Sequence, residues 1–63
     1  MPIAIIHLME GRDDAKKARA IAAVTQALVE SLEVKQESVR VIIQEIPPAH
    51  WGIAGKPVAA GPR

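Results

Sequence analysis

Two short apolar runs on either side of one long helix-forming segment limit what this chain can fold into. The first run, residues 3–9, is interrupted only by His7, and its β-branched content favours a strand buried on both faces. The second run, residues 38–46, also places apolar residues on both of its faces. A strand, a helix and a second strand in this order form a βαβ unit with parallel strands and a right-handed crossover.

The segment between the two runs has the composition of a helix from residue 15 to about residue 33. It is rich in Ala, Lys, Leu and Glu, which form helices well, and Asp13 before it is a suitable N-cap. Residues 35–37 form a polar connection to the second strand, and the Pro- and Gly-rich residues 47–57 predict turns and a short C-terminal hairpin. The predicted fold class is α/β, a single βαβ unit with a hairpin. The helix carries an apolar stripe at steps of three or four residues: Ile21, Val24, Leu28 and Leu32.

A unit of this size cannot cover its own apolar surface. The 63 residues are expected to form one domain, 1–63, and a chain this short buries only about 60% of its unfolded surface. The chain has no cysteine, so disulfides and thiolate zinc sites give no support, although 49% of its residues are hydrophobic. A single helix leaves one face of a two-stranded sheet open. We therefore expect a homo-oligomer whose subunits extend the sheet, with active sites between subunits.

The composition argues against several other functions. A net charge of +1 and a single aromatic residue, Trp51, predict no nucleic-acid partner. No stretch approaches the roughly 20 apolar residues of a membrane span, and no export signal is visible, so a cytoplasmic protein without membrane contact is expected. Neither His7 nor His50 has a partner at metal-ligand spacing, so no metal is expected. His7 is expected to be a structural, hydrogen-bonded histidine of a buried strand, and His50 a loop residue.

Pro2, directly behind Met1, has two alternative roles. Removal of Met1 is expected before so small a second residue, and it turns the Pro2 nitrogen into a secondary amine that can accept a proton. While Met1 is attached, the same nitrogen is a tertiary amide without a donor. The alternative is that Pro2 simply begins an edge strand, where a missing N–H has no cost.

Two arginines and the tryptophan are the other candidate site residues. Arg40 lies in an apolar strand. It is either a fork for a substrate carboxylate, or part of an ion pair with Glu45 or a helix acid, or a side chain that extends its charge to solvent at an interface. Arg12 is either a solvated loop charge or a second cation near Pro2, and Trp51 either an apolar wall or part of the oligomer core. Nearby cations and partial burial both lower the pKa of an amine toward neutrality, where it can serve as a general base.

These residues resemble the 4-oxalocrotonate tautomerase family over essentially the whole chain. The shared segments are Pro2-Ile3-Ala4, Ile6-His7, Glu10-Gly11-Arg12, Ser38-Val39-Arg40-Val41-Ile42-Ile43 and Gly52-Ile53. The resemblance implies a homohexamer built from βαβ dimers. It also implies a cofactor-free isomerase that converts a 2-hydroxydienoate such as 2-hydroxymuconate to its conjugated 2-oxo isomer, in aromatic hydrocarbon catabolism.

The resemblance also assigns roles to the candidate residues. Pro2 is the general base, Arg12 and Arg40 hold the carboxylates of an anionic dicarboxylate substrate, and Arg40 also polarises the 2-oxygen. Trp51 stands at the hydrophobic wall, where the family usually has phenylalanine. A bulkier wall and Ile5, in place of a polar residue common in the family, affect substrate choice more than proton transfer.

Three alternative functions remain open from the sequence. Relatives with the same proline are hydrolytic dehalogenases, but they carry a carboxylate near the aromatic residue, and residues 51–54 have none. Another promiscuous activity of the superfamily is the second alternative. The third is a non-catalytic oligomeric module, in which Pro2 begins a strand and the arginines form interface ion pairs.

Overall fold

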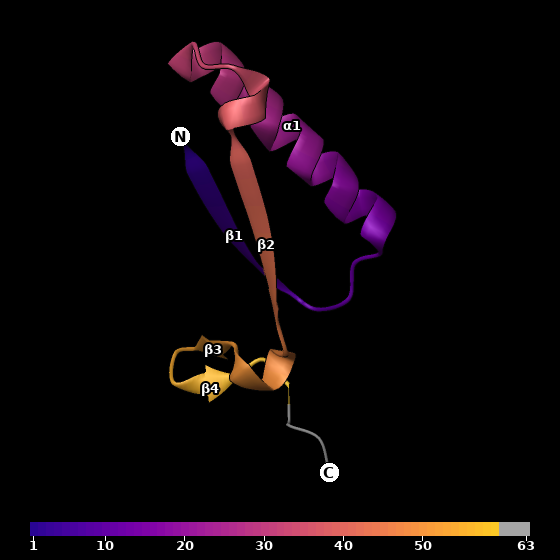
Figure 1. Ribbon diagram of the computed structural model, residues 1–63. Coiled ribbons are helices and arrows are strands. Elements are labelled where there is room, and N and C mark those ends of the chain that lie inside the picture. Colours follow the sequence, from indigo (N-terminus) through magenta and orange to yellow (C-terminus); the bar gives the residue numbers. More distant parts are fainter. Residues whose placement is uncertain (60–63) are drawn as a thin grey trace.

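The computed structural model describes residues 1–59 and has a βαβ unit followed by a hairpin (Figure 1). The first and second strands are parallel, and the two short strands of the hairpin are antiparallel. This confirms the predicted α/β fold class; residues 60–63 of the expected domain lie outside the described residues. In chain order the elements are β1 (Ile3–Met9), α1 (Asp14–Leu32), the 3-10 turn η1 (Gln36–Ser38), β2 (Arg40–Ile46), the 3-10 turn η2 (Pro48–His50), β3 (Gly52–Ile53) and β4 (Lys56–Pro57).

The β1–β2 ladder runs without a break along both strands. Its register pairs Ile3 with Arg40 at one end and Met9 with Ile46 at the other. The Arg40 N–H extends the ladder by donating to the Pro2 carbonyl at 3.0 Å. Because paired residues of a parallel ladder point to the same face, this register decides which side chains share a face.

Helix α1 begins at the predicted cap. The Asp13 backbone is extended and its side chain accepts a hydrogen bond from the Lys16 N–H at 2.8 Å, which satisfies one of the free amides of the first turn. The helix ends at Leu32, and Glu33 after it adopts a left-handed conformation with φ 54°. The predicted boundaries are each one residue too late.

The second strand begins at Arg40, two residues later than predicted, because η1 precedes it. In this turn the Ser38 N–H and the Ser38 hydroxyl both donate to the Lys35 carbonyl, at 3.0 and 2.8 Å. The Val39 N–H donates to the Gln36 carbonyl at 3.2 Å. Val39 is only 8% exposed, which makes it the one buried hydrophobic residue among residues 1–59. The turn and the buried valine fix the place where β2 starts.

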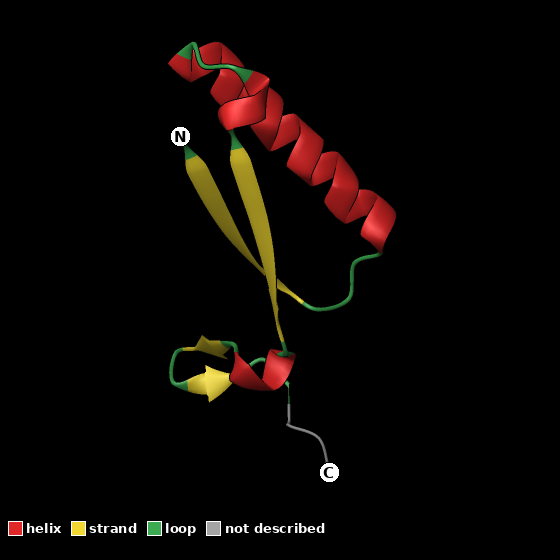
Figure 2. Cartoon of the chain, in the orientation of Figure 1, coloured by secondary structure: helices red, strands yellow, loops and turns green. Residues whose placement is uncertain are grey.

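One face of the sheet is open (Figure 2). Helix α1 lies along the other face, and Ile3, Ile5 and Ile42 on the open face are 57%, 58% and 49% exposed. His7 on β1 is exposed as well. The predicted burial of the first strand on both faces, with His7 inside, is therefore wrong for a single chain, because one helix can cover only one face.

The molecule is extended as well as open. Its radius of gyration is 14.9 Å, whereas a compact chain of this length has about 11 Å. Its accessible surface is 4905 Å², against about 3,900 Å² for a compact protein of this mass. The hairpin adds to this extension, because it lies beyond the end of the β1–β2 sheet (Figure 2). No helix within residues 1–59 is both long and apolar enough to cross a membrane.

Lys17 ties the start of α1 to β2. Its Nζ lies 3.1 Å from Oε1 of Glu45 on β2 and 3.1 Å from Oδ1 of Asp14 in the first helical turn. The hydrogen bond to Glu45 first, and that to Asp14 second, raise the pKa of Lys17 above its ordinary value of 10.5. Because the folded state binds this proton more tightly, the ion pairs stabilise the fold below pH 10.5 and are lost as pH rises through the higher folded-state pKa.

We therefore expect Lys17→Met to lower the denaturation midpoint more strongly at about pH 9 than at a pH above the raised pKa of Lys17, where the wild-type lysine has lost its charge. Urea unfolding followed by circular dichroism at both pH values measures the difference. Lys16→Met, a neighbouring lysine without an ion pair among residues 1–59, is the matched control. A wild-type advantage over Lys17→Met that is equal at both pH values would contradict this account.

Candidate active site

Arg40 is exposed at the start of β2, and backbone carbonyls hold one side of its guanidinium group. Its Nη1 donates to the Glu37 carbonyl at 2.7 Å and to the Val39 carbonyl at 3.3 Å. The ion pair with Glu45 or a helix acid, considered from the sequence, is wrong: Glu45 pairs with Lys17. Within residues 1–59 no hydrogen bond engages Nε or Nη2 of Arg40. A cationic fork is therefore left open at this end of the sheet.

Pro2 lies at the same end of the sheet as Arg40. The Pro2 carbonyl accepts the Arg40 N–H at 3.0 Å, so the backbones of the two residues are directly joined. Met1 is 77% exposed, so the peptide bond before Pro2 lies at an open end of the chain. While Met1 is attached, the Pro2 nitrogen is a tertiary amide. The hydrogen bond uses the carbonyl of Pro2 and not its nitrogen. Loss of Met1 therefore leaves this contact in place.

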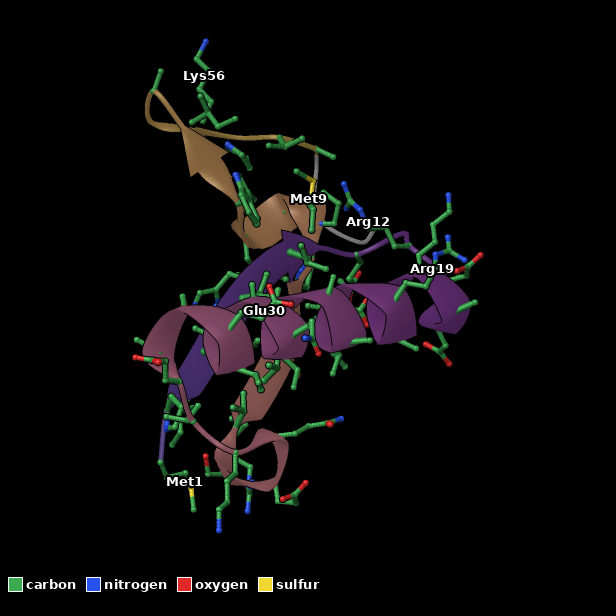
Figure 3. The ribbon with its side chains drawn as sticks, turned by 90° about the horizontal axis from the view of Figure 1, so that it is seen from above. Met1, Met9, Arg12, Arg19, Glu30 and Lys56 are labelled. Atoms are coloured by element: carbon green, nitrogen blue, oxygen red, sulfur yellow. The ribbon has the colours of Figure 1, made fainter. Side chains whose placement is uncertain are left out.

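Arg12 lies past the opposite end of β1. In Figure 3, Met9 and Arg12 lie between Met1 at one end of the molecule and Lys56 of the hairpin at the other. The seven residues of β1 separate Pro2 from Arg12, a distance of roughly 20 Å, which exceeds the reach of an arginine side chain. Arg12 is exposed and forms no ion pair within residues 1–59. A single chain does not bring Pro2 and Arg12 together.

Trp51 also lies at the far end, after β2 and η2. It lines a cavity of about 230 Å³ together with His7, Ile46, His50 and Gly52. The backbone N–H of Trp51 donates to the Pro48 carbonyl at 3.2 Å, and the Trp51 carbonyl accepts from the Val58 N–H at 2.9 Å. These two bonds fix the Trp51 backbone between η2 and the hairpin. Trp51 thus lines a cavity, but away from the Pro2 of its own chain, and its role as an apolar wall stays a prediction.

Sequence reasoning gave the two histidines of this cavity no role in a site. His50 adjoins Trp51 in the sequence, and this adjacency is the one local signal for it. His7 is far from Trp51 in the sequence and lies at the same cavity only because β1 pairs with β2. No pattern near His7 in the sequence indicates this. A second cavity, of about 350 Å³, contains none of the four candidate residues; it is lined by Asp14, Lys17, Ala18, Ile21, Ile43 and Glu45.

Arg40 and Pro2 together can bind an anion beside a nitrogen that becomes a free amine when Met1 is removed. Arginine's planar fork fits a carboxylate with two parallel hydrogen bonds. Among residues 1–59 no three His, Cys, Asp or Glu side chains are grouped so that they could share a metal ion. The arrangement has its anion-binding cation next to the chain's N-terminal segment, and its second cation and aromatic wall at the other end.

Comparison with known proteins gives a consistent result. A family model described as "Tautomerase enzyme" matches residues 2–61. A probable tautomerase of Ralstonia nicotianae is 53% identical over 60 residues, covering 95% of this chain and 86% of that protein. The 2-hydroxymuconate tautomerase of Stutzerimonas stutzeri is 48% identical over 60 residues, covering 95% of both chains. A solved heterohexamer 4-oxalocrotonate tautomerase from Chloroflexus aurantiacus superposes with a TM-score of 0.89 at 36% identity, covering 92% of this chain and 94% of that one. This chain therefore belongs to the tautomerase enzyme family and is an isomerase, as its resemblance to the 4-oxalocrotonate tautomerases predicted.

Proposed function

We propose that the protein is a cofactor-independent tautomerase that converts an unsaturated 2-hydroxy dicarboxylate of the 2-hydroxymuconate type to its 2-oxo isomer. The general base is Pro2 after removal of Met1. One observation carries the proposal: the Arg40 N–H is bonded to the Pro2 carbonyl while the Nε and Nη2 side of the same arginine is open. The names of the 2-hydroxymuconate tautomerases that this chain resembles support the substrate class.

In this proposal Pro2 moves one proton. Its free amine takes the proton from the 2-hydroxyl group, electrons shift along the conjugated system, and the proton returns to carbon at the far end. Arg40 binds a carboxylate and stabilises the charge that develops on the 2-oxygen. Arg12 binds the second carboxylate, and Trp51 supplies an apolar wall that keeps the amine poorly solvated and so disfavours its protonated form.

The four residues require more than one subunit. Pro2 and Arg12 lie at opposite ends of β1 in one chain, so a site that contains both takes Arg12 from a neighbour. The open apolar face and the extended shape support burial against further copies. We propose a homo-oligomer, a hexamer like that named for the Chloroflexus aurantiacus enzyme but of identical chains, in which residues 1–63 act as one domain. Residues 51–54 contain no carboxylate to activate water, so hydrolytic dehalogenation has no support.

If Pro2 is the base, turnover will fall severely when its nitrogen is blocked or when its secondary amine is replaced. We expect a protein with one glycine inserted before Pro2, and the Pro2→Ala variant, to lose about a hundredfold or more in kcat with 2-hydroxymuconate. The measurement is the ultraviolet absorbance of substrate and product, on protein whose intact mass shows that Met1 is gone. Size-exclusion chromatography controls for assembly. Unchanged turnover in the glycine-extended protein would refute the assignment.

Arg40 is tested by its two replacements. Arg40→Ala will lower kcat/KM by about a hundredfold, because it removes both the carboxylate fork and the charge beside the 2-oxygen. Arg40→Lys will retain only part of the wild-type kcat/KM, since lysine keeps the charge but lacks the fork. Arg19→Ala, another exposed arginine, is the matched control and is expected to match wild type (Figure 3). Dissociation of the oligomer by Arg40→Ala with no separable kinetic defect would instead favour the non-catalytic interface role.

Sharing of the site between subunits is tested by mixing two inactive variants. Unfolding and refolding Pro2→Ala together with Arg12→Ala will restore activity at about a quarter of the sites, because each site then has an even chance of an intact Pro2 and an even chance of an intact Arg12. Turnover per subunit is compared with that of each variant refolded alone. No recovery in mixed oligomers, whose composition is verified by mass spectrometry, would show that both residues come from one chain.

A further inference from the structure

We propose that Ser38 is a positioning residue for Arg40, and that the 3-10 turn η1 is the device through which it acts. This inference rests on the proposed function, since it concerns how the carboxylate fork of Arg40 is aimed. The Ser38 hydroxyl is not required to touch substrate. Its role is to hold the turn whose carbonyl fixes the guanidinium group.

The chain of contacts begins at the turn. The Ser38 hydroxyl donates to the Lys35 carbonyl at 2.8 Å, and the Ser38 N–H donates to the same carbonyl at 3.0 Å. Two donors on one acceptor close the turn more firmly than the backbone bond alone. Ser38 is half-buried, whereas Gln36 and Glu37 are exposed. Within residues 1–59, the Ser38 hydroxyl is the one side chain belonging to the turn that hydrogen-bonds to its backbone.

The next contact joins the turn to Arg40. The Glu37 carbonyl, inside the turn, accepts from Nη1 of Arg40 at 2.7 Å, a short distance typical of a charge-assisted bond. The Val39 carbonyl accepts from the same nitrogen at 3.3 Å. Val39 is 8% exposed and the Arg40 N–H is bonded to Pro2, so the backbone on both sides of the guanidinium contact is fixed.

This pattern selects one edge of the guanidinium group. Both carbonyls accept from the same nitrogen, Nη1. Nε–H and one N–H of Nη2 point in the same direction and form a fork that matches a carboxylate with two hydrogen bonds. The turn therefore holds Arg40 by its Nη1 side, and within residues 1–59 no hydrogen bond engages the Nε–Nη2 fork. If the turn opens, the side chain regains rotamers in which the fork points elsewhere, and a long side chain loses considerable entropy on binding.

The test uses binding and turnover together. Calorimetry with cis,cis-muconate, a dicarboxylate that lacks the 2-hydroxyl, measures the fork without needing proton transfer. Kinetics with 2-hydroxymuconate measure kcat and KM. The proteins are wild type, Ser38→Ala, Ser38→Thr, Ser38→Cys, Arg40→Ala and the double variant Ser38→Ala/Arg40→Ala. Ser31→Ala, an exposed serine of α1, is the control. Circular dichroism and size-exclusion chromatography confirm fold and assembly.

We expect Ser38→Ala to weaken muconate binding and raise KM about fivefold, the effect of one hydrogen bond. Ser38→Thr, which keeps the hydroxyl, restores most of the loss, and Ser38→Cys, a weak donor, lies between them. In the Arg40→Ala background Ser38→Ala changes binding less than about twofold, because the residues act as one unit.

Two results would overturn the inference. One is a Ser38→Ala protein that binds muconate like Ser31→Ala, and the other is an equal loss in both Arg40 backgrounds, which would indicate a merely structural serine. If Ser38→Ala does not fold, Ser38→Cys decides between these outcomes. Failure of the proposed function is distinct: muconate binding would depend on Arg40 and Ser38 while 2-hydroxymuconate is not turned over.

Discussion

The parallel ladder between β1 and β2 is the constraint on which the rest of this molecule depends. Its register continues beyond the strand ends, where the Arg40 N–H meets the Pro2 carbonyl at one end and the Glu10 N–H meets the Ile46 carbonyl at the other, both at 3.0 Å. A shift by one residue would transfer every side chain to the opposite face. It would also separate Arg40 from Pro2. Fold and candidate site are thus specified by the same hydrogen bonds.

Parallel strands also determine which residues of one chain can never meet. Both strands run from the end that carries Pro2 and Arg40 to the end that carries Arg12 and Trp51 (Figure 1). The crossover helix returns the chain to the starting end, so the turn after α1 falls beside Arg40. The ends of the sheet therefore hold complementary parts of one proposed site, and only a second copy can bring them together. In the proposed oligomer, the open apolar face is the surface available for such contact.

Much of this fold follows from local sequence patterns. The Asp13 cap, the helix and both strands could be predicted because each depends on periodicity and on residues close in sequence. The candidates Pro2 and Arg40 could be named for their chemistry, and the resemblance added their roles. The burial of β1 on both faces is wrong for a single chain, because residue types report that a face is apolar but not which chain covers it.

The contacts of Arg40 could not be predicted for a different reason. Glu45 was one partner considered for Arg40 from the sequence. In the structure, the Glu45 carboxylate pairs instead with Lys17 of α1. The actual partners of Arg40 are carbonyl oxygens, which every residue carries and no sequence pattern marks. The late start of β2 has the same origin, since it depends on a turn closed largely by backbone groups. Such contacts become visible only once the chain path is known.

The contact from Glu37 to Arg40 has a consequence for how such a chain can change over evolutionary time. Because the acceptor is a main-chain oxygen, the side chain at position 37 can drift, even in charge, without removing the oxygen that steadies the guanidinium. Insertions or deletions between α1 and β2 are a different matter, since they would displace the oxygen itself. At position 37, therefore, selection is expected to guard the length of the connection rather than the identity of the residue.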